Sequence, residues 1–174
     1  VALLEGLGVP RVVSAVHVDL AESGFPKIEV KNGKSVMVES NGGRVAFSYL
    51  SNALPWVLPG DAQVGYQLAR AGHRMSKESL RVTGLPAGEY TLGIDGEEVG
   101  AYTANALSRG IELQRNAKTP MYKQALAVAT LNQQRNQEAV APIRNLWLDR
   151  KIHRYAKQAA EQNPTDKEAA DRLA

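Results

Sequence analysis

Cysteine is absent from this chain of 174 residues. The chain therefore forms no disulfide, offers no thiolate to a metal ion and carries no cysteine nucleophile. The lack of cysteine does not define the compartment in which the protein works. The sequence also has no apolar run near the roughly 18 residues that a membrane-spanning helix needs, so we expect no membrane span.

A strong charge of one sign is missing as well. The formal net charge is +3, with 44% hydrophobic and 22% charged residues, which is ordinary for a globular protein. This balance supports neither a nucleic-acid partner nor a membrane surface, and we expect no nucleic acid. Basic residues do gather in the last third, where we favour a solvated helix face over a phosphate-binding surface. They are Arg135, Arg144, Arg150, Lys151, Arg154 and Lys157.

Recognisable catalytic motifs are also lacking. The sequence contains no Gly-x-Ser-x-Gly elbow and no phosphate-binding loop. Ser14, His17 and Asp19 are the residue types of a hydrolytic triad, but in a strand His17 and Asp19 share one face and Ser14 takes the other. His73 and His153 are predicted at the surface, and no two histidines have the spacing of a zinc site. We therefore predict no catalytic residue, no metal and no cofactor.

The first two thirds of the chain are rich in short β-type runs separated by turn residues. Strands are expected at 11–19, 27–31, 34–39, 44–50, 80–83, 90–94 and 98–102. Asn32-Gly33 and Asp95-Gly96 accept positive φ at both turn positions, so each predicts a tight hairpin. Residues 40–43 predict a further turn, and 64–71 a short helix that ends at Gly72. Thr103 and Gly110 are expected to begin and end another short helix.

The last third is predicted to be helical. Thr119 as N-cap and Pro120 at the first helical position form a start signal. Pro142 is expected to break or restart the helix, and Thr165 with Glu168 to cap a last one. One face of the first helix carries an apolar stripe, which is wider than packing on a sheet edge requires. We therefore expect an exposed apolar patch, which a partner absent from this chain would cover. It comprises Met121, Tyr122, Leu126 and residues 1–7.

Three aromatic residues are candidate ligand contacts. Trp56 lies in a segment, 53–60, that two prolines keep from being a regular strand. With Tyr49 and Tyr66 it provides the aromatic faces on which a sugar ring stacks. The alternative, which we favour, is a core tryptophan that fixes an irregular loop.

The chain is therefore predicted to be α+β, with an antiparallel β-rich N-terminal part followed by C-terminal α-helices. Residues 1–9 have the pattern of the end of an apolar helix followed by a glycine stop. We interpret them as the end of a helix from an upstream domain. Residues 10–117 then form a β-rich accessory region, and residues 118–174 a helical region.

Three motifs in order resemble the C-terminal region of bacterial SGNH (GDSL-type) hydrolases. Residues 80–100 read LRVTGLPAGEYTLGIDGEEVG and resemble that family's hairpin. Residues 103–113 read TANALSRGIEL and resemble the short helix that follows it. Residues 119–125 read TPMYKQA and resemble the opening of its long helix.

The resemblance implies ester hydrolysis, often deacetylation of carbohydrate, in a periplasmic or extracellular bacterial protein. The family's serine block, its oxyanion-hole residues and its Asp-x-x-His are expected upstream of Val1, so no catalytic residue is carried over. The sequence thus predicts an accessory or structural segment of a carbohydrate esterase that packs on the upstream catalytic domain and shapes its substrate cleft. The alternative is a carbohydrate-binding module without catalysis.

Overall fold

The computed structural model describes residue 3 and residues 6–20, 26–41, 43–58 and 60–162. The chain divides into two units, Val1–Ala129 and Thr130–Ala174. The α+β class is confirmed, because strands occupy the N-terminal part and long helices the C-terminal part. Within the described ranges, no helix has the length and apolar character of a membrane span.

A four-stranded sheet is the centre of the first unit. Its strands are β1 (Val12–Asp19), β2 (Lys27–Lys31), β5 (Lys77–Thr83) and β8 (Ile111–Glu112), in the order β2-β1-β5-β8. β1 pairs with β2, and β5 with β8, in antiparallel fashion. β1 and β5 pair in parallel, which sets strands that are distant in the sequence side by side.

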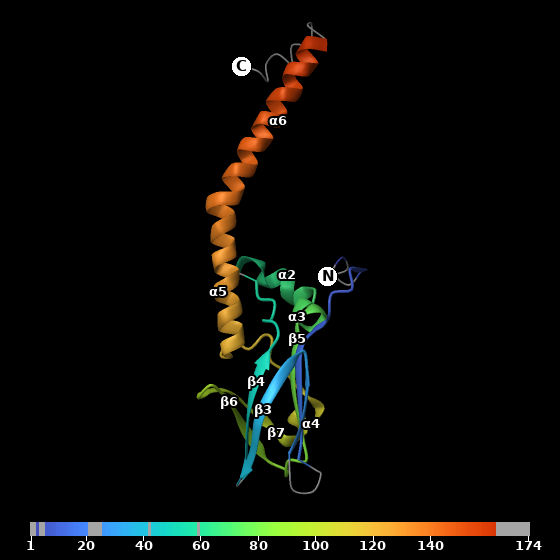
Figure 1. Cartoon of the computed structure of the whole chain (residues 1–174), viewed down its shortest axis with the longest axis vertical. Coiled ribbons are helices and arrows are strands. Elements are labelled where there is room, and N and C mark those ends of the chain that lie inside the picture. Colours follow the sequence, from blue (N-terminus) through green and yellow to red (C-terminus); the bar gives the residue numbers. More distant parts are fainter. Residues whose placement is uncertain (1–2, 4–5, 21–25, 42, 59, 163–174) are drawn as a thin grey trace. The chain divides into compact units, whose positions relative to one another are not determined.

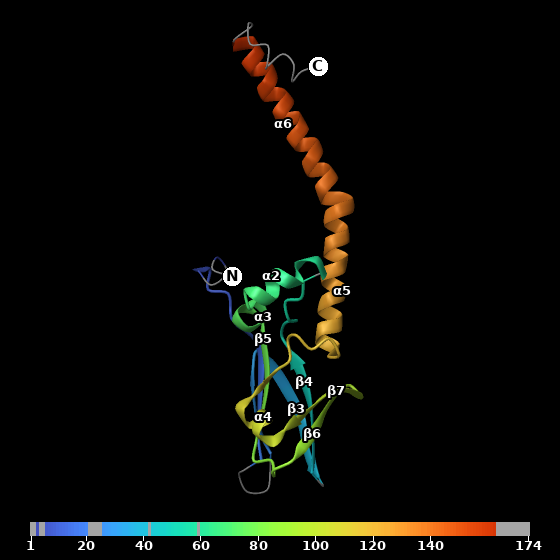
Figure 2. The same ribbon diagram turned by 180° about the vertical axis from the view of Figure 1, so that it is seen from behind.

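Two hairpins pack beside this sheet (Figure 1, Figure 2). One consists of β3 (Gly33–Asn41) and β4 (Arg44–Ser51), and the other of β6 (Glu89–Ile94) and β7 (Glu97–Thr103). The core lies where the sheet meets them, because alternate strand residues point to one face. Its buried members are Val16, Val18, Leu80, Val82, Leu107, Ile111 and Leu113.

One of the two predicted Gly-containing hairpins is confirmed and the other is wrong. Asp95 and Gly96 both have positive φ, 51° and 83°, and join β6 to β7. Asn32 also has positive φ, 55°, but β2 and β3 belong to different sheets. Gly33 instead begins β3, where an added Cβ would lie 2.7 Å from the carbonyl oxygen of Leu50. Close approach of two strands, rather than a turn, explains that glycine.

The short helices differ in part from expectation. A 3-10 turn, η1 (Gly60–Ala62), leads into α2 (Gln63–Leu68), so the helix predicted at 64–71 ends early. A separate helix, α3 (Ala71–Met75), follows it. The predicted limits of α4 (Ala104–Arg109) are confirmed at both ends, since Thr103 accepts a hydrogen bond from the Ala106 N–H and Gly110 has positive φ.

The helical part begins as predicted. Thr119 accepts a hydrogen bond from the Tyr122 N–H at 3.3 Å, and α5 spans Pro120–Arg135. A π-helical segment, η2 (Asn136–Val140), and then α6 (Ala141–Gln162) follow in the chain. Arg135 and Ala141, on either side of this segment, both have helical dihedral angles, so Pro142 does not break the helix as was predicted; a π-helical turn lies directly before α6 instead. The predicted capped helix at 165–168 lies outside the described residues.

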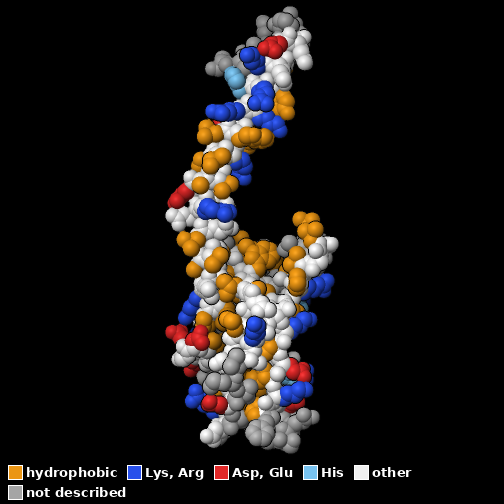
Figure 3. Space-filling view, viewed as in Figure 1, with side chains coloured by type: hydrophobic (Ala, Val, Ile, Leu, Met, Phe, Trp, Pro, Cys, Tyr) orange, Lys and Arg blue, Asp and Glu red, His pale blue; other side chains and the backbone are white. Residues whose placement is uncertain are grey.

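Apolar side chains are exposed along the helices (Figure 3). In the predicted patch, Met121 and Tyr122 are half-buried, while Leu126, Leu3 and Leu7 are exposed. The hydrogen bond from the Leu7 N–H to the Leu3 carbonyl has helical spacing. The largest exposed side chains of α6 are Ile143, Leu146, Trp147, Leu148, Ile152 and Tyr155.

The Asp95-Gly96 turn provides a direct test of the β6–β7 hairpin. Replacing Gly96 with Val places a β-branched residue at a φ of 83°, which strains the backbone. We expect the free energy of unfolding to fall by roughly 1–3 kcal/mol in urea denaturation. Gly96→Asn is the control, because Asn tolerates positive φ and stability should change little. Equal losses in the two variants would contradict the turn.

Candidate functional site

A polar cavity of about 330 Å³ lies between α2, α3 and the segment that follows β8. Gly72 is part of its wall, and a Cβ added there would collide with the hydroxyl group of Tyr66. The absence of a side chain at residue 72 therefore lets the two short helices pack closely. The lining residues are Tyr66, Gln67, Arg70, Gly72, His73, Glu112, Gln114 and Arg115.

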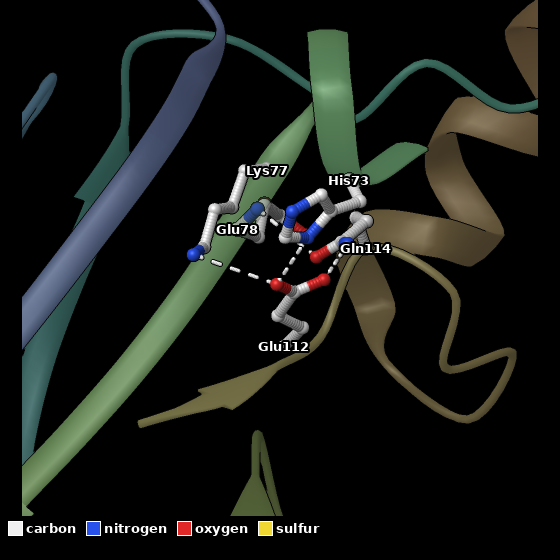
Figure 4. A network of polar contacts seen from close by, with 5 residues as sticks. All are labelled: His73, Lys77, Glu78, Glu112 and Gln114. Atoms are coloured by element: carbon white, nitrogen blue, oxygen red, sulfur yellow. Dashed lines mark hydrogen bonds and ion pairs between the residues drawn. The ribbon is translucent and has the colours of Figure 1, made fainter. Parts of the chain in front are cut away.

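Glu112 is the centre of a hydrogen-bonded network beside this cavity (Figure 4). Its Oε1 lies 2.6 Å from Nδ1 of His73 and 3.4 Å from Nζ of Lys77. Its Oε2 accepts a hydrogen bond of 2.6 Å from Nε2 of Gln114. Because an ionised carboxylate only accepts hydrogen bonds, Nδ1 of His73 carries the shared proton.

The pKa of the Glu112 carboxyl group reflects two opposing effects. Partial burial tends to raise it, because burial disfavours the charged form. Hydrogen bonds from Gln114 and His73, with the positive charges of His73 and Lys77, outweigh burial and lower the pKa of Glu112. Glu112 is thus an ionised, fully engaged carboxylate that holds α3, the start of β5 and the end of β8 together.

Glu78, one residue after Lys77, has the opposite environment. It is 2% exposed and lies on the buried face of β5, in phase with Leu80 and Val82. Its backbone N–H donates to Oε1 of Gln114 at 3.2 Å, yet among the described residues neither carboxyl oxygen has a hydrogen-bond partner. Burial raises the pKa of Glu78 to about 7, so the group is partly protonated at neutral pH.

A second, smaller cavity of about 150 Å³ shares Tyr66, Gln67 and Arg115 with the first. Its remaining lining comes from Trp56, Val57, Gln63 and Tyr122. The Tyr66 hydroxyl donates to the Trp56 carbonyl at 2.9 Å, and the two rings meet edge to face at 5.9 Å. Burial raises the pKa of Tyr66, which keeps its hydroxyl group protonated.

The structure brings together two of the three aromatic residues selected from the sequence. Trp56 is 39% exposed and lies against the buried Tyr66. Tyr49, on β4, packs instead against the hydrophobic core. The backbone N–H of Trp56 donates to Oγ of the buried Ser76 at 2.5 Å, so this loop is anchored to the C-terminal end of α3.

The Ser14, His17 and Asp19 constellation is not a triad. Nε2 of His17 lies 3.2 Å from Oγ1 of Thr83, and Thr83 donates to Oδ1 of Asp19 at 2.8 Å. Ser14 is buried on the opposite face of β1, as the alternation predicts. In the described part of the chain, no group of three or more His, Asp or Glu side chains has metal-binding geometry.

The polar network was missed in the sequence, although one signal was present. His73 and Glu112 are 39 residues apart and meet only through the fold. His73 was expected in a basic surface loop, whereas it lies on α3 with a carboxylate partner. The position of Glu78, two and four residues before Leu80 and Val82, already indicated a carboxyl group on the core face of a strand.

The opposite environments of Glu78 and Glu112 give opposite pH dependences of stability. The pKa of Glu78 is about 7 in the folded protein, compared with 4.5 for an ordinary glutamate. Below about pH 4.5 the group is protonated in both the folded and the unfolded state, so its burial as a charge does not reduce the free energy of unfolding. The reduction grows as pH rises to about 7 and is then constant. At roughly 1.36 kcal/mol per pH unit, Glu78→Gln should stabilise the protein by on the order of 3 kcal/mol at pH 8.

Urea denaturation of this variant at pH 4.5 and pH 8 checks the expectation. Glu112→Gln is the matched control, because a lowered pKa provides stability above its ordinary value and loses it as pH falls. That variant should therefore be less stable than the native chain at pH 8, with a smaller difference at low pH. A Glu78→Gln variant as unstable as Glu112→Gln at pH 8 would contradict the assignment.

Comparison with known proteins gives one informative match. No family model matches the chain, and no curated protein is similar to it. Among solved structures, the chain is similar to a gut microbial diltiazem-metabolizing enzyme, with a TM-score of 0.68 and 26% sequence identity. The match covers 98% of this chain and 43% of that enzyme, so the chain spans less than half of the enzyme's length.

Proposed function

We propose that this chain is the C-terminal accessory segment of an exported SGNH-type carbohydrate esterase. The observation that carries the placement of the chain within a larger enzyme is the structural match, in which nearly the whole chain corresponds to 43% of an enzyme, while the esterase class is proposed from the motif resemblance. The three ordered motifs at 80–100, 103–113 and 119–125 give independent support. In this proposal the chain packs on a catalytic domain and shapes its substrate cleft.

The chemistry of the described site supports an accessory role. Ester hydrolysis by this class needs a serine beside a histidine base that a carboxylate orients. His73 does contact a carboxylate, that of Glu112. No serine or threonine lines the described cavity beside it. His17 contacts Thr83, whose hydroxyl group donates to Asp19 and is held within the sheet.

A carbohydrate-binding module is the second candidate function. One observation favours it: Trp56 is partly exposed and lines the smaller cavity together with Tyr66. An exposed indole face next to polar side chains is a suitable platform for a sugar ring. The two candidates differ in their partner, which is a catalytic domain in the first case and a free saccharide in the second.

Hydrolysis assays test the leading proposal. We expect the purified chain to release no product from 4-nitrophenyl acetate or from diltiazem, because no serine or threonine lines the described cavity beside His73 and the Thr83 hydroxyl group beside His17 donates to Asp19. The full-length protein that contains the chain should hydrolyse 4-nitrophenyl acetate. A variant with His17, His73 and His153 all replaced by Ala is the control for contaminating esterase.

Activity of the isolated chain that disappears in this control would contradict the proposal. Sedimentation of the chain with the separately purified catalytic domain distinguishes the two candidates. A complex supports the accessory segment. A monomeric chain that ignores the domain but binds an oligosaccharide, and loses that binding in Trp56→Ala, would favour the binding module.

A further inference from the structure

We infer that the larger cavity is a binding site for a small oxyanionic ligand, a sugar-sized molecule that carries a carboxylate or a phosphate group. The inference rests on the charges and packing of the cavity and does not depend on the proposed function. Arg70 and Arg115 are the residues assigned to the anion, and Gln67 to the neutral part of the ligand, above a floor formed by Tyr66 and Gln114.

Two guanidinium groups on the cavity lining are available to a ligand. Arg70 follows α2, Arg115 follows the β8 segment, and both are exposed. In the described ranges, neither side chain has a hydrogen-bond or ion-pair partner within the protein. A guanidinium group presents paired donors that match the two oxygens of a carboxylate or phosphate group. Two unengaged arginines on one cavity therefore select an anion.

The carboxylate on the same cavity does not cancel this charge. Both oxygens of Glu112 are already engaged, by His73 and Lys77 on one side and by Gln114 on the other. The positive charge of Lys77 offsets the negative charge of Glu112. Arg70 and Arg115 then leave the cavity electropositive, whatever the protonation of His73.

The base of the cavity is rigid and polar, as a pre-formed site requires. Gln114 is 1% exposed and is fixed at both ends, by the Glu78 N–H and by Glu112. Tyr66 is held by its hydrogen bond to the Trp56 carbonyl. Arg70 has a φ of 49°, which is uncommon for a residue other than glycine and directs the chain between α2 and α3.

The size of the cavity limits the ligand. Its volume of about 330 Å³ is at the lower end of the range for ligand pockets, roughly 300–1,000 Å³. A monosaccharide derivative or a molecule of similar size fits this limit, whereas a polymer would need an open groove. The adjoining smaller cavity shares Tyr66, Gln67 and Arg115 and leads toward Trp56, which extends the surface for a substituent.

Isothermal titration of the whole chain with three matched sugars tests the inference. Glucose is the neutral control, and glucuronate and glucose 6-phosphate add a carboxylate or a phosphate to the same ring. We expect at least one anionic sugar to bind about tenfold or more tightly than glucose, because charged hydrogen bonds exceed neutral ones. Tighter binding of glucuronate identifies a carboxylate ligand, and tighter binding of glucose 6-phosphate a phosphate ligand.

Arg115→Gln and Arg70→Gln should each weaken binding of the anionic sugar about tenfold, because each removes a charged donor. Arg44→Gln is the matched control, since Arg44 is an exposed arginine at the start of β4 and should leave the affinity unchanged. Thermal melts of the three variants verify that they are folded. Equal affinity for glucose and both anionic sugars, or binding unaffected by either cavity variant, would overturn the inference without bearing on the esterase proposal.

Discussion

The parallel pairing of β1 with β5 is the interaction on which the rest of the first unit depends. It joins the buried faces of the two strands, so that Val16 and Val18 meet Leu80 and Val82 in one core. A parallel pair needs a long connection, and here that connection contains β2, β3, β4 and two short helices. Those elements must therefore pack around the same two strands, which sets the place of the β3–β4 hairpin and of α3.

A polar site forms at the start of β5. The N-terminal end of the strand carries Lys77 and Glu78, and the antiparallel partner β8 brings Glu112 and Gln114 beside them. One carboxylate is engaged by three neighbours, while the other is buried without a described partner. A buried carboxyl group of this kind disfavours folding when it is charged, so Glu78 lowers stability at neutral pH, and it lines neither of the two described cavities.

The two proposals concern different surfaces of the chain. An accessory role depends on the apolar side chains exposed along the helices and on a domain that covers them. Anion binding depends on Arg70 and Arg115 beside the rigid floor of Tyr66 and Gln114. The smaller cavity connects Trp56 with the arginine-lined cavity, because the two cavities share lining residues. A segment that packs on an enzyme and also holds a charged ligand is physically consistent with this arrangement.

The sequence by itself determined the features that depend on near neighbours. Asp95-Gly96, the Thr103 cap and Thr119-Pro120 were predicted correctly, because backbone sterics and capping hydrogen bonds act within a few residues. The α+β class and the opposite faces of Ser14 and His17 followed from periodicity. Partner choice between strands was decided only by the tertiary structure, and it overrode the turn preference of Asn32-Gly33. The cavity was likewise invisible in the sequence, because contacts such as His73 with Glu112 join residues far apart in the chain, which only the folded core brings within hydrogen-bonding distance.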